Sequence, residues 1–151
     1  MDKSSLLKLS KKIGDYFVDN KMTNVLDKII NLGQSAAIAE NEEMKKKNKF
    51  YRLMWAMNKN PGMLGGGNAL RDSFLTFISN YLVLNYRFNN VECRNREFSR
   101  LSFDEMMYVF SWAERYLKYA MSVTDYKINN RRVEYQTSGQ KHKQNNYKKR
   151  K

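Results

Sequence analysis

The chain has 151 residues, of which 28 are Lys or Arg and 15 are Asp or Glu, giving a formal net charge of +13. This length suits one domain with a buried core, and the charge favours a polyanionic partner such as nucleic acid. The single cysteine, Cys93, excludes an internal disulfide and a thiolate zinc site. No apolar run reaches the ~18 residues of a membrane span, and residues 1–16 do not resemble a secretory signal, so we expect a cytoplasmic protein with no membrane partner.

Two helices are predicted in the first forty residues, because apolar side chains recur there every three or four positions. The first ends near Asp19 and Asn20. Thr23 can cap the second, which either ends at Gly33 or continues through Ala39 with the glycine tolerated at a cost of ~1 kcal/mol. The apolar residues of the first helix are Leu6, Leu7, Leu9, Ile13, Tyr16 and Phe17, and those of the second begin with Val25, Leu26, Ile29, Ile30 and Leu32.

A third helix is predicted over residues 40–59, and Asn60-Pro61-Gly62 stops it. Its acidic residues precede its basic residues, an order that suits the helix dipole. The basic cluster is either a solvated face balanced by nearby acids or a stripe that tracks phosphate groups. It consists of Lys45, Lys46, Lys47, Lys49 and Arg52. Apolar residues at and beyond the end of this helix exceed one stripe, so we expect part of them at a protein interface. They are Met54, Trp55, Met57, Met63 and Leu64.

A fourth helix is predicted after three consecutive glycines, with Asn68 as its cap. Its apolar stripe is Leu70, Phe74, Phe77, Ile78, Tyr81 and Leu82. The glycines do not match a nucleotide-binding P-loop, which needs Lys and Ser or Thr next and a strand before. A flexible turn is favoured, and a backbone contact to an RNA phosphate stays open.

Residues 86–99 have no clear period and are predicted to form a loop or a frayed connection. They include arginines beside two aromatic residues, Tyr86 and Phe88. That mixture is typical of single-stranded nucleic-acid binding, in which bases stack and guanidinium groups contact phosphates. Alternatively, the two aromatic residues belong to the core of a frayed helix end. The arginines are Arg87, Arg94 and Arg96, with Arg100 just beyond.

The clearest helix begins after Ser102, which forms a predicted capping box with Glu105. Leu101 and Met106 occupy the two positions of a hydrophobic staple. The apolar stripe is Met106, Val109, Phe110, Ala113, Leu117, Ala120 and Met121. The sequence therefore predicts an all-α fold, a compact bundle of about five helices over residues 1–125.

Residues 126–151 are predicted to form a basic tail that is disordered by itself, because few apolar residues remain to offset ordering entropy. They hold 9 basic and 1 acidic residue, a net +8, against 19 basic and 14 acidic residues, a net +5, in residues 1–125. The tail is either an electrostatic arm or a solubilising segment.

The sequence contains no recognisable catalytic apparatus, metal cluster or cofactor motif, so we expect a non-enzyme without a cofactor. The only histidine, His142, lies in the basic tail and is interpreted as one more hydrogen-bond donor there. The candidate residues are all cationic and are assigned to nucleic-acid binding. They are Lys45, Lys46, Lys49, Arg52, Arg71, Arg87, Arg94 and Arg96.

Three segments together resemble the small subunit of Cmr-type (type III-B) CRISPR effector complexes. Residues 45–64, KKKNKFYRLMWAMNKNPGML, are similar to that family's basic stretch and apolar end. Residues 65–79 are similar to its glycine turn and helix, although this chain has Gly-Gly-Gly-Asn where the family has Asn-Gly-Leu. Residues 98–122 resemble its closing helix. The matched positions in that helix are Leu101, Ser102, Trp112, Arg115 and Ala120.

The resemblance implies a non-catalytic helical subunit that stacks with copies of itself into a short filament. Its implied partners are guide RNA, single-stranded target RNA and other subunits of the effector complex. Lys49, Arg52 and Arg71 are the matched residues most open to a contact with the RNA backbone. Two rivals stay open: a stand-alone helical DNA-binding protein of a plasmid or phage, and a structural interaction protein with a basic tail.

Overall fold

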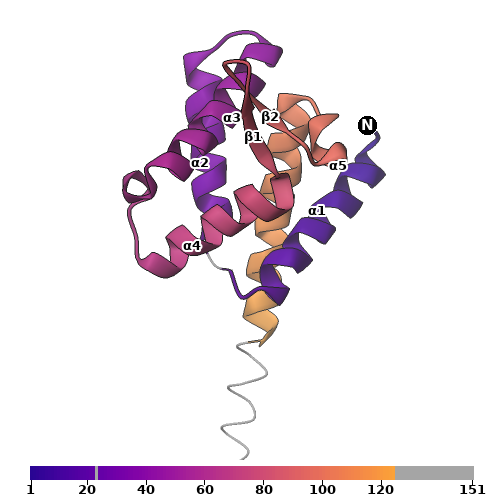
Figure 1. Ribbon diagram of the computed structural model, residues 1–151. Helices are drawn as coiled ribbons and strands as arrows, with labels where there is room; N and C mark the ends of the chain where they lie inside the picture. Colours follow the sequence, from indigo (N-terminus) through magenta and orange to yellow (C-terminus); the bar gives the residue numbers. More distant parts are fainter. Residues whose placement is uncertain (23, 125–151) are drawn as a thin grey trace, which may run out of the picture. The chain divides into compact units, whose positions relative to one another are not determined.

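The computed structural model of the chain describes residues 1–22 and 24–124, and helices dominate it (Figure 1). The fold is all-α, as predicted, with one small β-hairpin. The first half contains α1 (Lys3–Asp19), α2 (Val25–Ala39), α3 (Glu43–Lys59) and a 3₁₀ helix (Pro61–Leu64). The second half contains α4 (Asn68–Thr76), a π-helix (Phe77–Leu82), β1 (Leu84–Arg87), β2 (Asn90–Cys93), α5 (Arg96–Ser99) and a last helix over 103–124.

Met1–Leu117 form one compact unit, and Lys118–Lys151 are grouped separately. Residues 118–124 are helical, and the hydroxyl of Thr124 donates a hydrogen bond to the carbonyl of Ala120. The predicted basic tail, together with His142, lies outside the described residues. No helix in the described ranges has both the length and the apolar character needed to cross a membrane.

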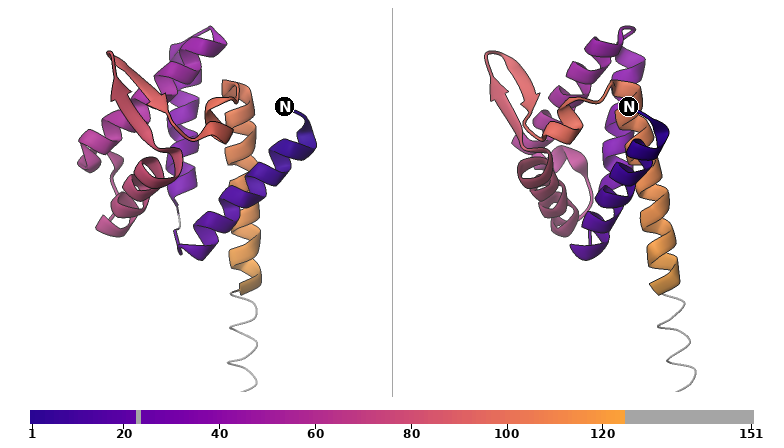
Figure 2. Two further views of the ribbon diagram at one scale, coloured as in Figure 1. Left: turned by 45° about the vertical axis from the view of Figure 1, so that its right-hand side comes forward. Right: turned by 90° about the vertical axis from the view of Figure 1, so that its right-hand side faces the viewer.

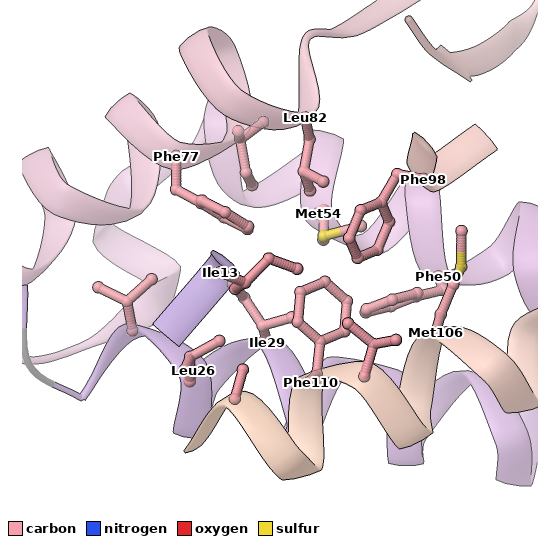
Figure 3. Close-up of a cluster of buried hydrophobic side chains, with 14 of the residues drawn as sticks. Ile13, Leu26, Ile29, Phe50, Met54, Phe77, Leu82, Phe98, Met106 and Phe110 are labelled. Carbon is pink, nitrogen blue, oxygen red and sulfur yellow. The ribbon is translucent and has the colours of Figure 1, made fainter. Parts of the chain in front are cut away.

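The core of the first unit is built around Phe110 of the last helix (Figure 3). Its ring centroid lies 5.0 Å from that of Phe98, 6.0 Å from that of Phe50 and 6.3 Å from that of Phe77. These three rings come from α5, α3 and the π-helix, so one side chain joins three elements. All four rings are buried, and burying each contributes about 1.5–3 kcal/mol.

The first two helices agree with the apolar pattern, except that Leu7 is 42% and Ile38 88% exposed. α2 continues through Gly33 to Ala39, which decides between the two predicted lengths. A Cβ atom at Gly33 would clash with the sulfur of Met107, so this glycine leaves room for a side chain of the last helix. The predicted cap, Thr23, lies outside the described residues, and Asn24 precedes α2 without a side-chain capping bond.

α3 begins at Glu43, later than predicted, and ends at Lys59 as predicted. The three glycines form a turn: Gly65 and Gly66 have φ values of +68° and +73°, which favour glycine. A 3₁₀ helix precedes this turn, so the strand that a P-loop needs is replaced by helix. The cap of α4 is Gly67 and not Asn68, which is the first residue of the helix. That prediction was wrong because the turn ends one residue earlier than expected.

The prediction of a loop or frayed connection over residues 86–99 was wrong, because β1 and β2 form an antiparallel hairpin there. Its turn is Phe88-Asn89, with φ values of +51° and +58°, the conformation of a type I′ turn. Each strand has four residues, too few to show a persuasive alternation. A phenylalanine in the left-handed region is uncommon, so the sequence lacks the usual turn signal.

The start of the last helix confirms the predicted capping box. The hydroxyl of Ser102 accepts a hydrogen bond from the backbone N–H of Glu105 at 3.1 Å. The carboxylate of Glu105 accepts one from the N–H of Ser102 at 2.9 Å. Leu101 and Met106 are both buried, as the staple requires. These contacts fix where the helix begins and which face turns towards the core.

Candidate nucleic-acid interface

One face of α3 is cationic and free of the core. Lys45, Lys49, Arg52 and Lys59 follow one another at intervals of four, three and seven residues, which place them on one side of a helix. The opposite side carries the buried residues Phe50, Tyr51 and Met54. Burial of that side therefore directs the four cations away from the core. We call these four residues the α3 basic face.

Acidic neighbours neutralise little of the α3 basic face. Lys45 forms an ion pair of 3.2 Å with Glu42, and both side chains are largely exposed, so solvent screens the pair. Lys49 and Arg52 form no ion pair within residues 1–22 and 24–124. The ammonium of Lys59 lies 5.2 Å from the ring centroid of Trp55. The face therefore keeps a net positive charge.

Two other lysines of the predicted cluster lie elsewhere on the helix. Lys46 is half-buried and lies about 100° around the axis from Lys45. Lys47 donates a hydrogen bond of 2.7 Å from its ammonium to the carbonyl of Ser99. Burial lowers the pKa of Lys47. Lys47 thus joins α3 to the end of α5, and only part of the cluster lies on the exposed stripe.

The hairpin lies against α3, and its turn points outward (Figure 2). The rings of Trp55 and Tyr86 are 6.3 Å apart between centroids, with 16° between their planes. Together with Lys59 and Asn85, they line an open hollow. The structure therefore brings the third helix and the arginine-aromatic segment together at this point.

The aromatic residues of the hairpin are exposed. Tyr86 is 52% and Phe88 85% accessible to solvent, so the alternative that both are core residues is wrong. The hydroxyl of Tyr86 donates to the amide oxygen of Asn89 at 3.2 Å, which links its ring to the turn. The guanidinium carbon of Arg87 lies 4.9 Å from the ring centroid of Phe88. Cation and aromatic ring are therefore paired at the tip.

The remaining candidate arginines lie apart from this tip. Arg94 follows β2 at the base of the hairpin, and three residues of strand, about 10 Å, separate that end from Arg87. Arg96 is exposed at the first position of α5. Arg71 lies on α4, where its Nε atom is buried and has no hydrogen-bond partner among the described residues. Arg100 borders a different hollow, beside α1.

Cys93 and Tyr51 give no sign of nucleophilic chemistry. The thiol of Cys93 donates to the carbonyl of Leu82 at 3.1 Å, and burial raises its pKa. A raised pKa leaves little thiolate, the reactive form, at neutral pH. Burial likewise raises the pKa of the Tyr51 phenol. Within the described part of the chain, no three His, Cys, Asp or Glu side chains gather as metal ligands would.

The apolar set predicted at a protein interface divides in two. Met54 and Leu64 are buried in the core, whereas Met63 is 65% exposed. Trp55 and Met57 are half-buried and pack against the core. Ile38 and Met44, near the connection of α2 and α3, are exposed apolar residues that the sequence did not single out. A role at a protein interface therefore stays a prediction, carried mainly by Met63.

Three residues of this region are not predicted from the sequence: Lys59, Trp55 as an aromatic surface, and Asn85. The seven-residue interval from Arg52 to Lys59 was a signal for the first. No sequence signal marked Trp55 as an aromatic surface or Asn85 as its neighbour, because their position depends on the pairing of the hairpin. No protein-family model, curated protein or solved structure matches the chain. Function is therefore inferred from the charges, rings and packing of the chain itself.

Proposed function

We propose that this protein is a non-catalytic subunit that binds single-stranded RNA along the α3 basic face. The observation that carries the proposal is the alignment of Lys45, Lys49, Arg52 and Lys59 on one side of a helix, where Lys49 is half-buried and the other three are exposed. From Lys45 to Lys59 the helix rises about 21 Å, so the face is long enough to follow several successive phosphates. Contacts of this kind bind the backbone and carry no sequence information.

Sequence-blind contacts suit an RNA-guided complex, which must accept any guide and any target. The resemblance to the Cmr-type small subunit supports this setting. We propose guide RNA, target RNA, the other effector subunits and copies of the chain itself as partners. The absence of a reactive cysteine or a metal cluster among the described residues is compatible with a subunit that leaves cleavage to its neighbours.

The capping box disfavours the rival of a stand-alone DNA-binding protein. A recognition helix presents base-reading side chains at its N-terminal end. At the start of the last helix, Ser102 and Glu105 are engaged with each other, and Asp104 is exposed. Glu105 is also paired with the N-terminal ammonium of Met1, and the exposed carboxylate of Asp104 would repel the phosphates of a duplex.

Charge reversal on α3 tests the proposal against a matched control. Lys45→Glu/Arg52→Glu and Lys3→Glu/Lys8→Glu each change the net charge by −4, and all four side chains are exposed. We expect the α3 variant to weaken binding of a single-stranded RNA about tenfold or more. We also expect it to reduce the log–log salt slope by ~1.4, which is ~0.7 for each lost phosphate contact. The control variant should change both quantities much less.

Both variants should retain their melting temperature, because exposed substitutions usually change stability by less than about 0.5 kcal/mol. Equal losses in the two variants would mean that net charge alone drives binding, and would remove the α3 basic face as the interface.

The setting has a separate test. The native protein, purified from its own cells, should bring short guide RNAs and effector subunits with it, and purification without either contradicts the assignment to a complex.

A further inference from the structure

Two aromatic rings from distant parts of the chain lie side by side at the surface, next to the α3 basic face. Trp55 belongs to α3 and Tyr86 to β1, and their planes are within 16° of parallel at a centroid distance of 6.3 Å. Trp55 is half-buried and Tyr86 is half-exposed, so each ring has a buried part and a part open to solvent. We call the two rings the aromatic platform.

The fold holds the aromatic platform in place before any ligand arrives. Trp55 packs against the hydrophobic core. Tyr86 pairs across the hairpin with Val91, which is buried, and its hydroxyl is bonded to Asn89 in the turn. Rings fixed in this way lose little conformational entropy when another planar group stacks on them.

The hollow at the platform has a composition that fits one chemical class. The residues that line it are Trp55, Tyr86, Lys59 and Asn85, so two aromatic residues lie beside a cation. A nucleobase presents a flat π-face on which the two rings can stack. The phosphate attached to the same nucleotide is the natural partner of the ammonium. An apolar protein segment would leave Lys59 without an anionic partner at this site.

We propose that the aromatic platform stacks a base of the RNA strand whose phosphates follow the α3 basic face. This inference rests on the proposed function and deepens it, because it assigns a contact to the bases as well as to the backbone. Stacking accepts every base, since each has a π-face, so the contact adds affinity and stays largely independent of sequence. Lys59 belongs to both surfaces and lies where the strand would pass from one to the other.

A comparison of two oligomers with the same charge tests the stacking contact. The probes are a 12-nucleotide oligouridine and an abasic oligomer with the same number of phosphates. The full chain should bind oligouridine about tenfold more tightly than the abasic oligomer, a ratio within the range of one stacked base. Tyr86→Thr and Trp55→Leu should bring this ratio close to one and leave the salt slope unchanged, because the phosphate contacts remain.

Trp112→Leu is the matched control. Like Trp55, Trp112 has a cation over its ring, the guanidinium carbon of Arg115 at 4.9 Å, but it is 39% exposed and lies on the last helix. Replacing Trp112 should leave the ratio of the affinities for oligouridine and for the abasic oligomer the same as in the unaltered chain. A ratio that falls equally in this variant would mean that the contact is not specific to the aromatic platform, and would overturn the inference.

Fluorescence gives a measurement that does not depend on the stability of platform variants. The chain has two tryptophans, so Trp112→Phe leaves Trp55 as the only one. Saturation with oligouridine should quench Trp55, and saturation with the abasic oligomer should not. If the unaltered chain binds both oligomers equally and Trp55 is not quenched, stacking is overturned while the α3 basic face stands. If neither oligomer binds, both the inference and the proposed function fail.

Discussion

Phe88 combines two properties that a turn residue rarely has. It is an aromatic side chain with 85% of its surface exposed, and its φ of +51° lies in the left-handed region that favours Gly and Asn. Neither property helps the hairpin to fold. Phe88 is not part of the aromatic platform. Its ring contacts the guanidinium of Arg87, and this contact lies at the surface. At this position the sequence therefore departs from what the turn requires.

Phe88→Asn should stabilise the protein, because asparagine adopts the left-handed conformation at a lower cost. We expect a gain of about 0.5–1 kcal/mol in the free energy of unfolding, comparable to other substitutions that suit a strained backbone position. The rise in melting temperature should be about 1–4 °C for a chain of this size. Phe88→Val is the control: it also removes the exposed ring, but a β-branched residue tolerates positive φ poorly. A lower melting temperature in both variants would contradict the account of the turn.

At the scale of elements, the start of the last helix depends on the Ser102 capping box. Ser102→Ala removes the acceptor for the N–H of Glu105 and should destabilise the protein by about 1 kcal/mol. Ser111→Ala is the matched control, because Ser111 lies inside the same helix and alanine has the higher helix propensity. Thermal or denaturant unfolding should show a loss for the first and no loss for the second. Equal stabilities would mean that packing alone fixes the start of the helix.

The elements differ in how far the sequence predicts them. The helices were predictable because their signals are local. These signals are the spacing of apolar residues, the stop at Asp19 and Asn20, and the capping box at Ser102. The hairpin was not, because two short strands and a Phe-Asn turn give no such signal. The same division holds for the candidate site. Helical spacing alone places Lys45, Lys49 and Arg52 on one face, whereas contact between α3 and the hairpin depends on tertiary packing.

At the scale of the whole molecule, positive charge is distributed unevenly along the chain. Residues 1–125 carry a net +5 and residues 126–151 a net +8. The basic tail lies outside the described residues, and its role as an arm or as a solubilising segment stays a prediction. In the proposed function, the α3 basic face gives a bound strand a defined path, which a diffuse positive charge does not. Binding to both regions should weaken with salt, because each phosphate contact releases counterions.

The central claim is that the protein binds single-stranded RNA through its backbone and accepts any sequence. The most direct test is to titrate the full chain with two single-stranded RNAs of equal length and unrelated sequence at several salt concentrations. We predict dissociation constants within about threefold of each other and the same log–log salt slope, since backbone and stacking contacts discriminate weakly. Tight binding of one RNA with a loss of tenfold or more for the other would show that the protein reads bases. That result would contradict the account and favour a stand-alone regulator.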